Sequence, residues 1–226
     1  MPVKLLNLSD AARFLSMDEK VLRSMAMAGE VPSVMQGARL MFEREELDNW
    51  YTNRLLHHQP LKQLVHLPAQ EVLNLADFCR LETMETALEG RTKPAVLKSL
   101  TALAERSGLL YDPAEFLENL RQREEIASTA MAEGVALVHP ENRDEFLCED
   151  TFVCIAKAQT PVFFGEENGG ATDLFFVIAG PDSELHLRLL SRICTLIATT
   201  PILARLREAT TPEEMLAAVQ AGHGVN

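Results

Sequence analysis

AEGVALVHP, at residues 132–140, is the stretch from which the fold of this chain follows. Its apolar run, Val135 to Val138, has the length and branching of a buried strand, and His139 comes directly after it. Because Pro140 has no N–H to donate to a neighbouring strand, we expect the strand to end at the histidine. An imidazole at the tip of a rigid strand is well placed to act as a nucleophile, but it also occurs there as a plain strand-end residue.

Strand and helix signals alternate on both sides of this stretch. Further strand candidates cover residues 152–156 and 174–179, and residues 87–91 have the composition of a turn or a helix end. Helices are expected through residues 97–104, from Pro113 to about residue 125, over 184–198, and from near Pro201 and Pro212, the last two with a threonine as N-cap. This alternation predicts a mixed sheet covered by helices.

Two neighbouring runs carry a resemblance to a known family: Arg123-Glu124-Glu125-Ile126-Ala127-Ser128-Thr129, and Glu133 to His139. They resemble the signature of the fructose/mannitol-type enzyme IIA domain of the bacterial phosphotransferase system. In that family an Arg-Glu pair ends a helix, and a later strand presents a phosphorylated histidine. The likeness covers roughly residues 71 to 222, through the further blocks Thr160-Pro161-Val162, Asp173 to Ile178, Glu184-Leu185-His186-Leu187 and Arg205-Leu206-Arg207.

This resemblance implies roles for particular residues. His139 would accept the phosphoryl group, His186 would hydrogen-bond it, and Arg123 would supply a cationic contact. Glu133 matches an acidic position of mannitol-type members and is a minor candidate. Structural interpretations stay open, because His186 also suits the edge of the core and Arg123 also suits a surface ion pair with a neighbouring glutamate.

The chain departs from the family pattern beside His139. The family usually has proline before the histidine and glycine after it, whereas this chain has Val138 and Pro140. Pro140 removes a backbone N–H that a phosphate would bind, and Glu141 adds a negative charge that Arg143 is placed to offset. A site that has lost phosphoryl acceptance is therefore an open alternative.

The first 57 residues carry a different pattern. Ser9 and Asp18 are the expected N-caps of two short helices joined by a tight turn. A small hairpin turns around Gln36-Gly37. A helix then runs from residue 43 to about residue 56, with two core candidates, Leu47 and Trp50.

This order of elements resembles the excisionase/MerR-like winged helix-turn-helix, through Leu8 to Leu15, Gly29-Glu30-Val31-Pro32, Gly37-Ala38-Arg39 and Arg44 to Trp50. In such domains the second helix enters the major groove and the wing touches the DNA backbone. The resemblance implies a DNA-binding set: Lys20, Arg23 and Ser24 on that helix and Arg39 on the wing. Because Asp18 and Glu19 would repel phosphates, a domain kept for dimerisation or protein docking is the competing interpretation.

The net charge of −12 is unevenly distributed. Residues 1–58 hold seven Lys and Arg against eight Asp and Glu, whereas residues 59–226 hold fourteen against twenty-five. General affinity of the C-terminal part for nucleic acid is therefore not expected. No apolar run approaches the roughly 20 residues that span a bilayer, and the N-terminus lacks signal-peptide features, so we expect a cytoplasmic protein without membrane insertion. Buried reduced thiols are expected for Cys79, Cys148, Cys154 and Cys194.

Taken together, the sequence predicts an α+β or α/β protein with two domains. A small winged helix-turn-helix domain (1–57) and a linker (58–70), with a short helix at 61–67, precede an enzyme IIA-like domain (71–222) whose mixed sheet is flanked by helices. The expected protein is a phosphorylation-responsive bacterial regulator, a phosphohistidine carrier that needs no metal or other cofactor. Its expected partners are an HPr-like phosphohistidine carrier protein, DNA and, because such domains often pair on palindromic sites, a second copy of the chain. The alternatives are a phosphocarrier that serves a sugar permease and a degenerate, unphosphorylated interaction module.

Overall fold

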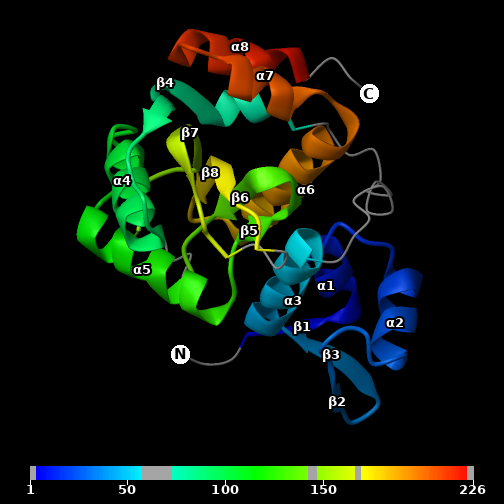
Figure 1. Cartoon of the computed structure of the whole chain (residues 1–226). Helices are drawn as coiled ribbons and strands as arrows, with labels where there is room; N and C mark the ends of the chain where they lie inside the picture. Colours follow the sequence, from blue (N-terminus) through cyan, green and yellow to red (C-terminus); the bar gives the residue numbers. More distant parts are fainter. Residues whose placement is uncertain (1–3, 58–72, 142–146, 166–168, 223–226) are drawn as a thin grey trace. The chain divides into compact units, whose positions relative to one another are not determined.

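The computed structural model describes residues 4–57, 73–141, 147–165 and 169–222 (Figure 1). Its packing divides the chain into two compact units, Met1–Val72 and Leu73–Asn226. The expected linker at 58–70, with its short helix at 61–67, lies outside the described residues.

The smaller unit combines helices with a three-stranded antiparallel sheet. The sheet has the order β1-β3-β2, formed by β1 (Leu5–Asn7), β2 (Val34–Gln36) and β3 (Arg39–Glu43). Its helices are α1 (Leu8–Phe14), α2 (Glu19–Met27) and α3 (Arg44–His57). The expected pair of short helices, the hairpin and the third helix are therefore all present.

Three details of this unit differ from the expectations. The side chain of Asn7, and not of Ser9, caps α1 by accepting a hydrogen bond from the first turn at 3.0 Å, so this helix begins two residues earlier. Strand β1 was not expected, because its three residues are too few to show the alternation that predicts a strand. Of the two core candidates on α3, Leu47 is fully buried as expected, whereas Trp50 is partly exposed. Tyr51 and Leu55 are buried beside Leu47 instead.

The larger unit is built on a mixed five-stranded sheet in the order β4-β7-β8-β6-β5. Strand β6 (Val135–Val138) runs parallel to β8 (Thr172–Ala179) and antiparallel to β5 (Ala130–Met131). On the other side of β8, β7 (Phe152–Val162) is antiparallel to it and parallel to the edge strand β4 (Cys79–Leu88). The expected mixed sheet is thus confirmed.

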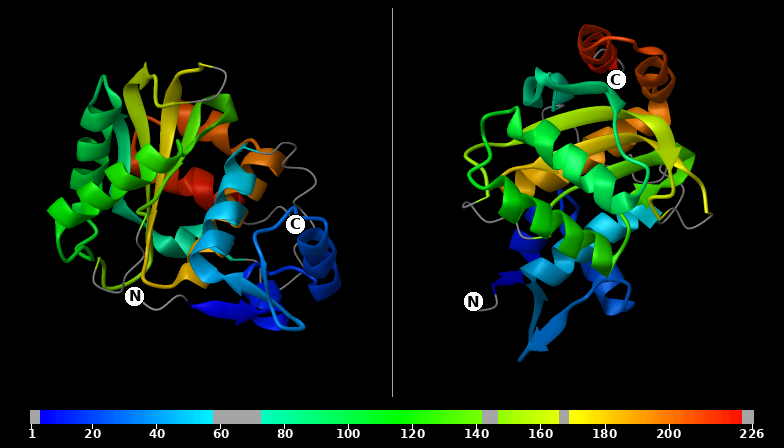
Figure 2. Two further views of the ribbon diagram at one scale, coloured as in Figure 1. Left: turned by 90° about the horizontal axis from the view of Figure 1, so that it is seen from below. Right: turned by 60° about the vertical axis from the view of Figure 1, so that its left-hand side comes forward.

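Helices cover both faces of this sheet (Figures 1 and 2). One face is covered by α4 (Lys93–Glu105) and α5 (Pro113–Ile126), the other by α6 (Ser183–Thr199), α7 (Ile202–Glu208) and α8 (Pro212–Ala221). Single 3-10 turns, Leu75–Phe78 and Ala132–Gly134, precede β4 and β6. A strand that is covered on both faces has no polar side, which explains why β6 is apolar throughout.

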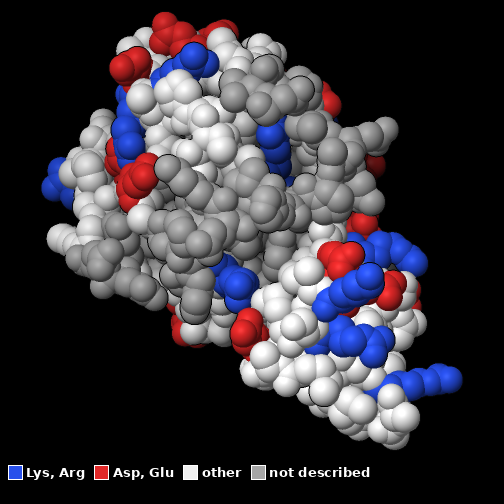
Figure 3. Space-filling view, turned by 90° about the vertical axis from the view of Figure 1, so that its right-hand side faces the viewer, with Lys and Arg blue, Asp and Glu red and all other residues white. Residues whose placement is uncertain are grey.

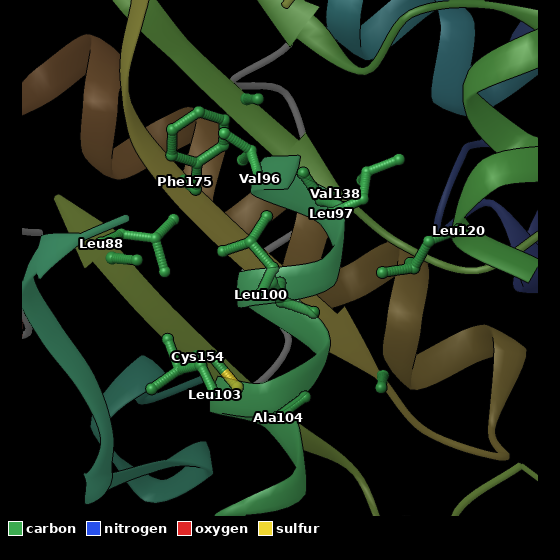
Figure 4. Packing of buried hydrophobic residues seen from close by; sticks show 14 of the residues in the cluster. Leu88, Val96, Leu97, Leu100, Leu103, Ala104, Leu120, Val138, Cys154 and Phe175 are labelled. Atoms are coloured by element: carbon green, nitrogen blue, oxygen red, sulfur yellow. The ribbon is translucent and has the colours of Figure 1, made fainter. Parts of the chain in front are cut away.

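Alternation along the strands sorts their side chains between the two layers. Ala136 and Val138 join the cluster that packs against α4 and α5, where Leu100 and Leu120 meet the sheet (Figure 4). Val135 and Leu137, on the opposite side of the pleat, belong to the α6 layer.

In the larger unit the sequence did not predict strands β4 and β5 or the full length of β7. The edge strand β4 is rich in polar residues and pairs with an irregular register, and it continues to Leu88, where a turn or helix end is expected. Strand β5 has only two residues. Strand β7 runs on to Val162 in spite of Pro161, because its register with β8 shifts after Lys157 and a bulge tolerates a residue without an N–H.

The helix starts otherwise follow the sequence. Asp112 and Thr211 cap α5 and α8 with their side chains, as expected. For α7 the expected N-cap was Thr200, but the N-cap is Pro201, so the helix starts one residue later than expected. Thr200 Oγ1 still accepts a hydrogen bond from the Ile202 N–H at 3.3 Å.

The loop that enters β6 is fixed by an ion pair. Arg207 of α7 donates to both carboxylate oxygens of Asp173 at 2.8 and 2.7 Å and also to the Glu133 carbonyl. Gly134 follows with a φ of +73°, and a Cβ there would lie 2.9 Å from Asp173 Oδ1, so the tight approach requires glycine. These contacts set where β6 starts and therefore where His139 emerges.

No single helix among the described residues is long and apolar enough to cross a membrane. Together α6 and α7 have the length and composition, but they meet at a bend of 87°.

All four cysteines are free, as expected, and Cys79 alone is only partly buried. Burial raises the pKa of each thiol, which keeps it protonated near neutral pH.

Candidate functional site

His139 lies one residue beyond the end of β6, between the two helical layers. Arg123 approaches it from α5 and His186 from α6. The histidine side chain is only 2% exposed. The structure thus brings together the three residues that the sequence singled out.

The hydrogen bonds of His139 define its tautomer. Nδ1 lies 2.8 Å from the Leu137 carbonyl oxygen, which only accepts, and Nε2 lies 3.0 Å from Arg123 Nε, which only donates. The ring is therefore neutral, with its proton on Nδ1 and its lone pair on Nε2. Burial, with a smaller effect of the Arg123 charge, lowers the pKa of His139 to about 3.

Arg123 stands in the last turn of α5 and is 2% exposed. Its Nη1 donates to the Ala127 carbonyl at 2.7 Å, at the helix end where a cation is favoured. Burial lowers the pKa of this guanidinium, and the carboxylates of Glu141 and Glu124 act in the opposite direction. The surface ion pair considered from the sequence is not the arrangement found, because this arginine is buried against the histidine.

Glu124, the next residue, fixes the turn that follows α5. Its carboxylate accepts hydrogen bonds from the Thr129 N–H, at 3.0 Å, and from the Thr129 hydroxyl. Lys93, from the first turn of α4, neutralises the same carboxylate at 2.7 Å. The network holds the end of α5, and with it Arg123, beside β5. Sequence reasoning missed Lys93, which lies 31 residues away and shows no local signal.

His186 is fully buried in the first turns of α6. Its ring packs edge-on against the His139 ring, with the centroids 5.1 Å apart and the planes at 62°. The first free N–H groups of this helix are occupied, since the Asp182 carboxylate accepts from Glu184 and Leu185 at 2.8 and 3.1 Å. His186 therefore offers a side chain to the site, while the helix terminus is already capped.

Two acidic residues noted in the sequence, the minor candidate Glu133 and the departure Glu141, lie at opposite ends of β6. Glu133 precedes the strand, with its carbonyl bound to Arg207, so it lies away from the imidazole. Glu141 follows His139, and its Oε2 lies 3.9 Å from Arg123 Nε. The Glu141 carboxylate, which was expected near the phosphoryl position, therefore faces the Arg123 guanidinium.

The residues expected to bind DNA are all exposed. Lys20, Arg23 and Ser24 share one face of α2, and Arg39 starts β3. Arg23 and Arg39 both line a hollow of about 400 Å³ between α2 and the hairpin, together with apolar side chains such as Met27. Figure 3 shows Lys and Arg gathered with some Asp and Glu over the lower part of its view, where this unit faces the reader.

Asp18 has a structural role in the same unit. Its carboxylate caps α2 by accepting from the Lys20 and Val21 N–H groups at 2.8 and 3.2 Å. Its charge is thus partly satisfied by the helix terminus, whereas Glu19 is exposed and lines the hollow.

No group of three or more His, Cys, Asp or Glu residues is placed to hold a metal ion, as far as the described ranges extend.

Comparison with known proteins adds a family to this geometry. Residues 77–222 match the family described as "Phosphoenolpyruvate-dependent sugar phosphotransferase system, EIIA 2". The nitrogen regulatory protein of Pseudomonas aeruginosa is 30% identical over 128 residues, 56% of this chain and 81% of that protein. The 2-O-alpha-mannosyl-D-glycerate-specific EIIABC component of Escherichia coli is 26% identical over 151 residues, 66% of this chain but only 23% of that longer protein.

Solved structures share the fold. The nitrogen regulatory protein IIA-Ntr of Neisseria meningitidis superposes with a TM-score of 0.57 at 24% identity, covering 64% of this chain and 97% of that one. The mannitol IIA of Escherichia coli gives 0.55 at 21% identity, covering 62% and 97%. The family match begins at residue 77, so it leaves the smaller unit unidentified.

The lowered pKa of His139 leads to a pH-dependent stability. The unfolded imidazole takes up a proton below about pH 6.5, whereas the buried imidazole does so only near pH 3. Proton uptake therefore favours the unfolded state, and the free energy of unfolding decreases as the pH falls from about 6.5 toward about 3. We expect the free energy of unfolding of the wild type to fall between pH 7 and pH 5 by about 2 kcal/mol more than that of His139→Gln. Urea titrations at both pH values measure this difference, and parallel pH profiles for the two proteins would contradict the burial of a neutral imidazole.

Proposed function

This chain belongs to the phosphoenolpyruvate-dependent sugar phosphotransferase system EIIA 2 family, and on that premise we propose that its larger unit accepts a phosphoryl group on Nε2 of His139. The observation that carries the proposal is the orientation of the ring. The Leu137 carbonyl holds Nδ1–H at 2.8 Å, which leaves the Nε2 lone pair as the nucleophile. The Arg123 guanidinium stands beside that nitrogen, where the negative charge of a phosphoryl group would arrive.

The transfer step follows from this arrangement. The Nε2 lone pair attacks the phosphorus of a phosphohistidine on the donor protein, the donor's P–N bond breaks, and the donor imidazole keeps the electron pair. The His139 ring becomes cationic, and the Leu137 carbonyl stabilises its Nδ1–H more strongly than before. Arg123 has to release Nε2 first, because the lone pair that accepts its hydrogen bond is the one that forms the new bond.

The donor in this proposal is an HPr-like phosphohistidine carrier protein, the usual partner of such domains. The phosphoryl group would serve a regulatory purpose, since the same chain carries a second unit and a relative at 30% identity is a nitrogen regulatory protein. The alternative is onward transfer to the enzyme IIB of a sugar permease, as a phosphocarrier. Phosphate that moves from this protein to a permease's cytoplasmic domain would favour that alternative.

Removing the nucleophile tests the proposal. We expect wild-type protein incubated with phosphoenolpyruvate, enzyme I and HPr, or its nitrogen-branch counterpart, to gain one acid-labile phosphate by intact-protein mass. His139→Ala should gain none, and unfolding curves should show that this variant is still folded. His186→Gln is the matched control, a second buried histidine whose loss should slow the labelling without moving its position. Equal labelling of wild type and His139→Ala would contradict the assignment.

For the smaller unit we propose DNA binding. Arg23 and Arg39 lie on the two sides of one hollow, and the exposed face of α2 adds Lys20 and Ser24. This arrangement suits a helix α2 that enters the major groove and a hairpin that contacts the phosphate backbone of the DNA. Two copies of the chain would match a palindromic site. The phosphorylation state of His139 would then alter DNA binding by the same chain.

Charge removal tests this second proposal. In gel shifts on genomic fragments we expect Arg23→Ala combined with Arg39→Ala to weaken binding and to lower the salt slope by about two, one for each lost phosphate contact. Arg13→Ala is the control, since that arginine forms an exposed pair with Asp10 on α1. If the wild type shows no salt-sensitive, sequence-selective binding, the unit serves dimerisation or protein docking instead.

A further inference from the structure

Glu141 is aimed at the guanidinium that the proposed phosphoryl group needs. Its Oε2 lies 3.9 Å from Arg123 Nε, the same nitrogen that donates to His139 Nε2 at 3.0 Å. The Glu141 backbone N–H donates to the Asn119 carbonyl at 3.3 Å, one helical turn before Arg123. The backbone therefore holds this carboxylate beside the turn of α5 that carries the arginine.

The Glu141 carboxylate is poorly satisfied where it lies. Oε2 is buried and makes no hydrogen bond within the described ranges, although 26% of the side chain is exposed. Glu124, the other carboxylate near Arg123, has Lys93 at 2.7 Å and the donors of Thr129. Among the described residues Glu141 has no comparable set of donors, and the Arg123 guanidinium is the cation that its carboxylate faces. Arg143, which the sequence placed to offset this charge, lies outside the described residues.

A phosphoryl group on Nε2 would bring close to two negative charges to the same guanidinium. Because Arg123 is 2% exposed, water screens charges around it far less than at an open surface. Two anions would then compete for one cation, and each would raise the cost of holding the other. The acidic residue two places after the histidine, a departure from the family pattern, thus acts on the Arg123 guanidinium.

We propose that Glu141 is an internal competitor for Arg123, a carboxylate that occupies the phosphate-binding cation in the free protein and has to be displaced when His139 is phosphorylated. This inference rests on the proposed function, whose phosphoryl acceptor is His139. It makes phosphorylated His139 less populated at equilibrium and readier to pass its phosphoryl group on. It also ties phosphorylation to movement of the Glu141 side chain, because the carboxylate loses its partner.

Glu141→Gln tests the competition, because it removes the charge and keeps the shape. Glu118→Gln is the matched control, since it removes one carboxylate from an exposed ion pair on α5, the helix that carries Arg123. With a phosphorylated HPr-type donor at a fixed ratio, we expect the equilibrium constant for phosphoryl transfer to rise about tenfold in Glu141→Gln and to stay within about twofold in Glu118→Gln. The half-life of the phosphorylated protein should lengthen in parallel. If Glu141→Gln does not fold, Glu141→Ser repeats the measurement.

The outcomes separate this inference from the proposed function. Equal labelling of wild type and Glu141→Gln overturns the competition and leaves the phosphoryl acceptor in place. Labelling of Glu141→Gln alone overturns the function of the natural chain and supports the competition in its strongest form.

If neither protein is labelled, the proposed function fails, and inorganic phosphate decides the inference. Its binding is followed at the NMR signal of the Arg123 Nε–H. At least fivefold tighter binding by Glu141→Gln than by wild type supports the competition. Equal affinity, or no binding to either protein, overturns it.

Discussion

The site depends on one buried interaction, the hydrogen bond from the Arg123 Nε–H to His139 Nε2. A guanidinium that is 2% exposed has given up most of its hydration, so it needs acceptors on several sides. It finds a carbonyl at the end of its own helix, the imidazole at the end of β6 and the nearby carboxylate of Glu141. Burial keeps the imidazole neutral, and this contact, together with the Leu137 carbonyl, selects Nε2 as the nitrogen with the lone pair. A structural need, the satisfaction of a buried charge, thus sets the chemistry of the histidine.

The rest of the larger unit makes that contact possible. Strand β6 starts where Arg207 ties Asp173 to the Glu133 carbonyl, and its four residues are held between β8 and β5, so the position of His139 follows from the register. On the side of Arg123, the hydrogen bond from the Thr129 N–H to the Glu124 carboxylate fixes the end of α5. Arginine and histidine are 16 residues apart, and each is anchored within a few residues of the contact. Such local anchoring is what holds two long-range partners in hydrogen-bonding geometry.

The sequence predicted the parts of this arrangement that leave a local pattern. The apolar run before His139, with Pro140 behind it, gave β6, and capping residues such as Asp112 gave the helix starts. The meeting of Arg123, His139 and His186 came from the family resemblance, because no spacing in one sequence shows which helix faces a strand end. Strand β4 stayed hidden because its polar residues lack alternation at the sheet edge. The Leu137 carbonyl stayed hidden because every residue has one, and only the three-dimensional structure shows which carbonyl the ring meets.

The central claim is that His139 is a neutral imidazole with its proton on Nδ1 and an unprotonated Nε2 that accepts a hydrogen bond from Arg123. Long-range ¹⁵N–¹H correlation spectra of the imidazole rings, assigned by comparison with His139→Gln, measure this directly. The account predicts a protonated Nδ1 and an unprotonated, pyridine-like Nε2 that stay unchanged from pH 8 to pH 5. An Nε2–H tautomer, or a ring that titrates near an ordinary histidine pKa, would contradict it.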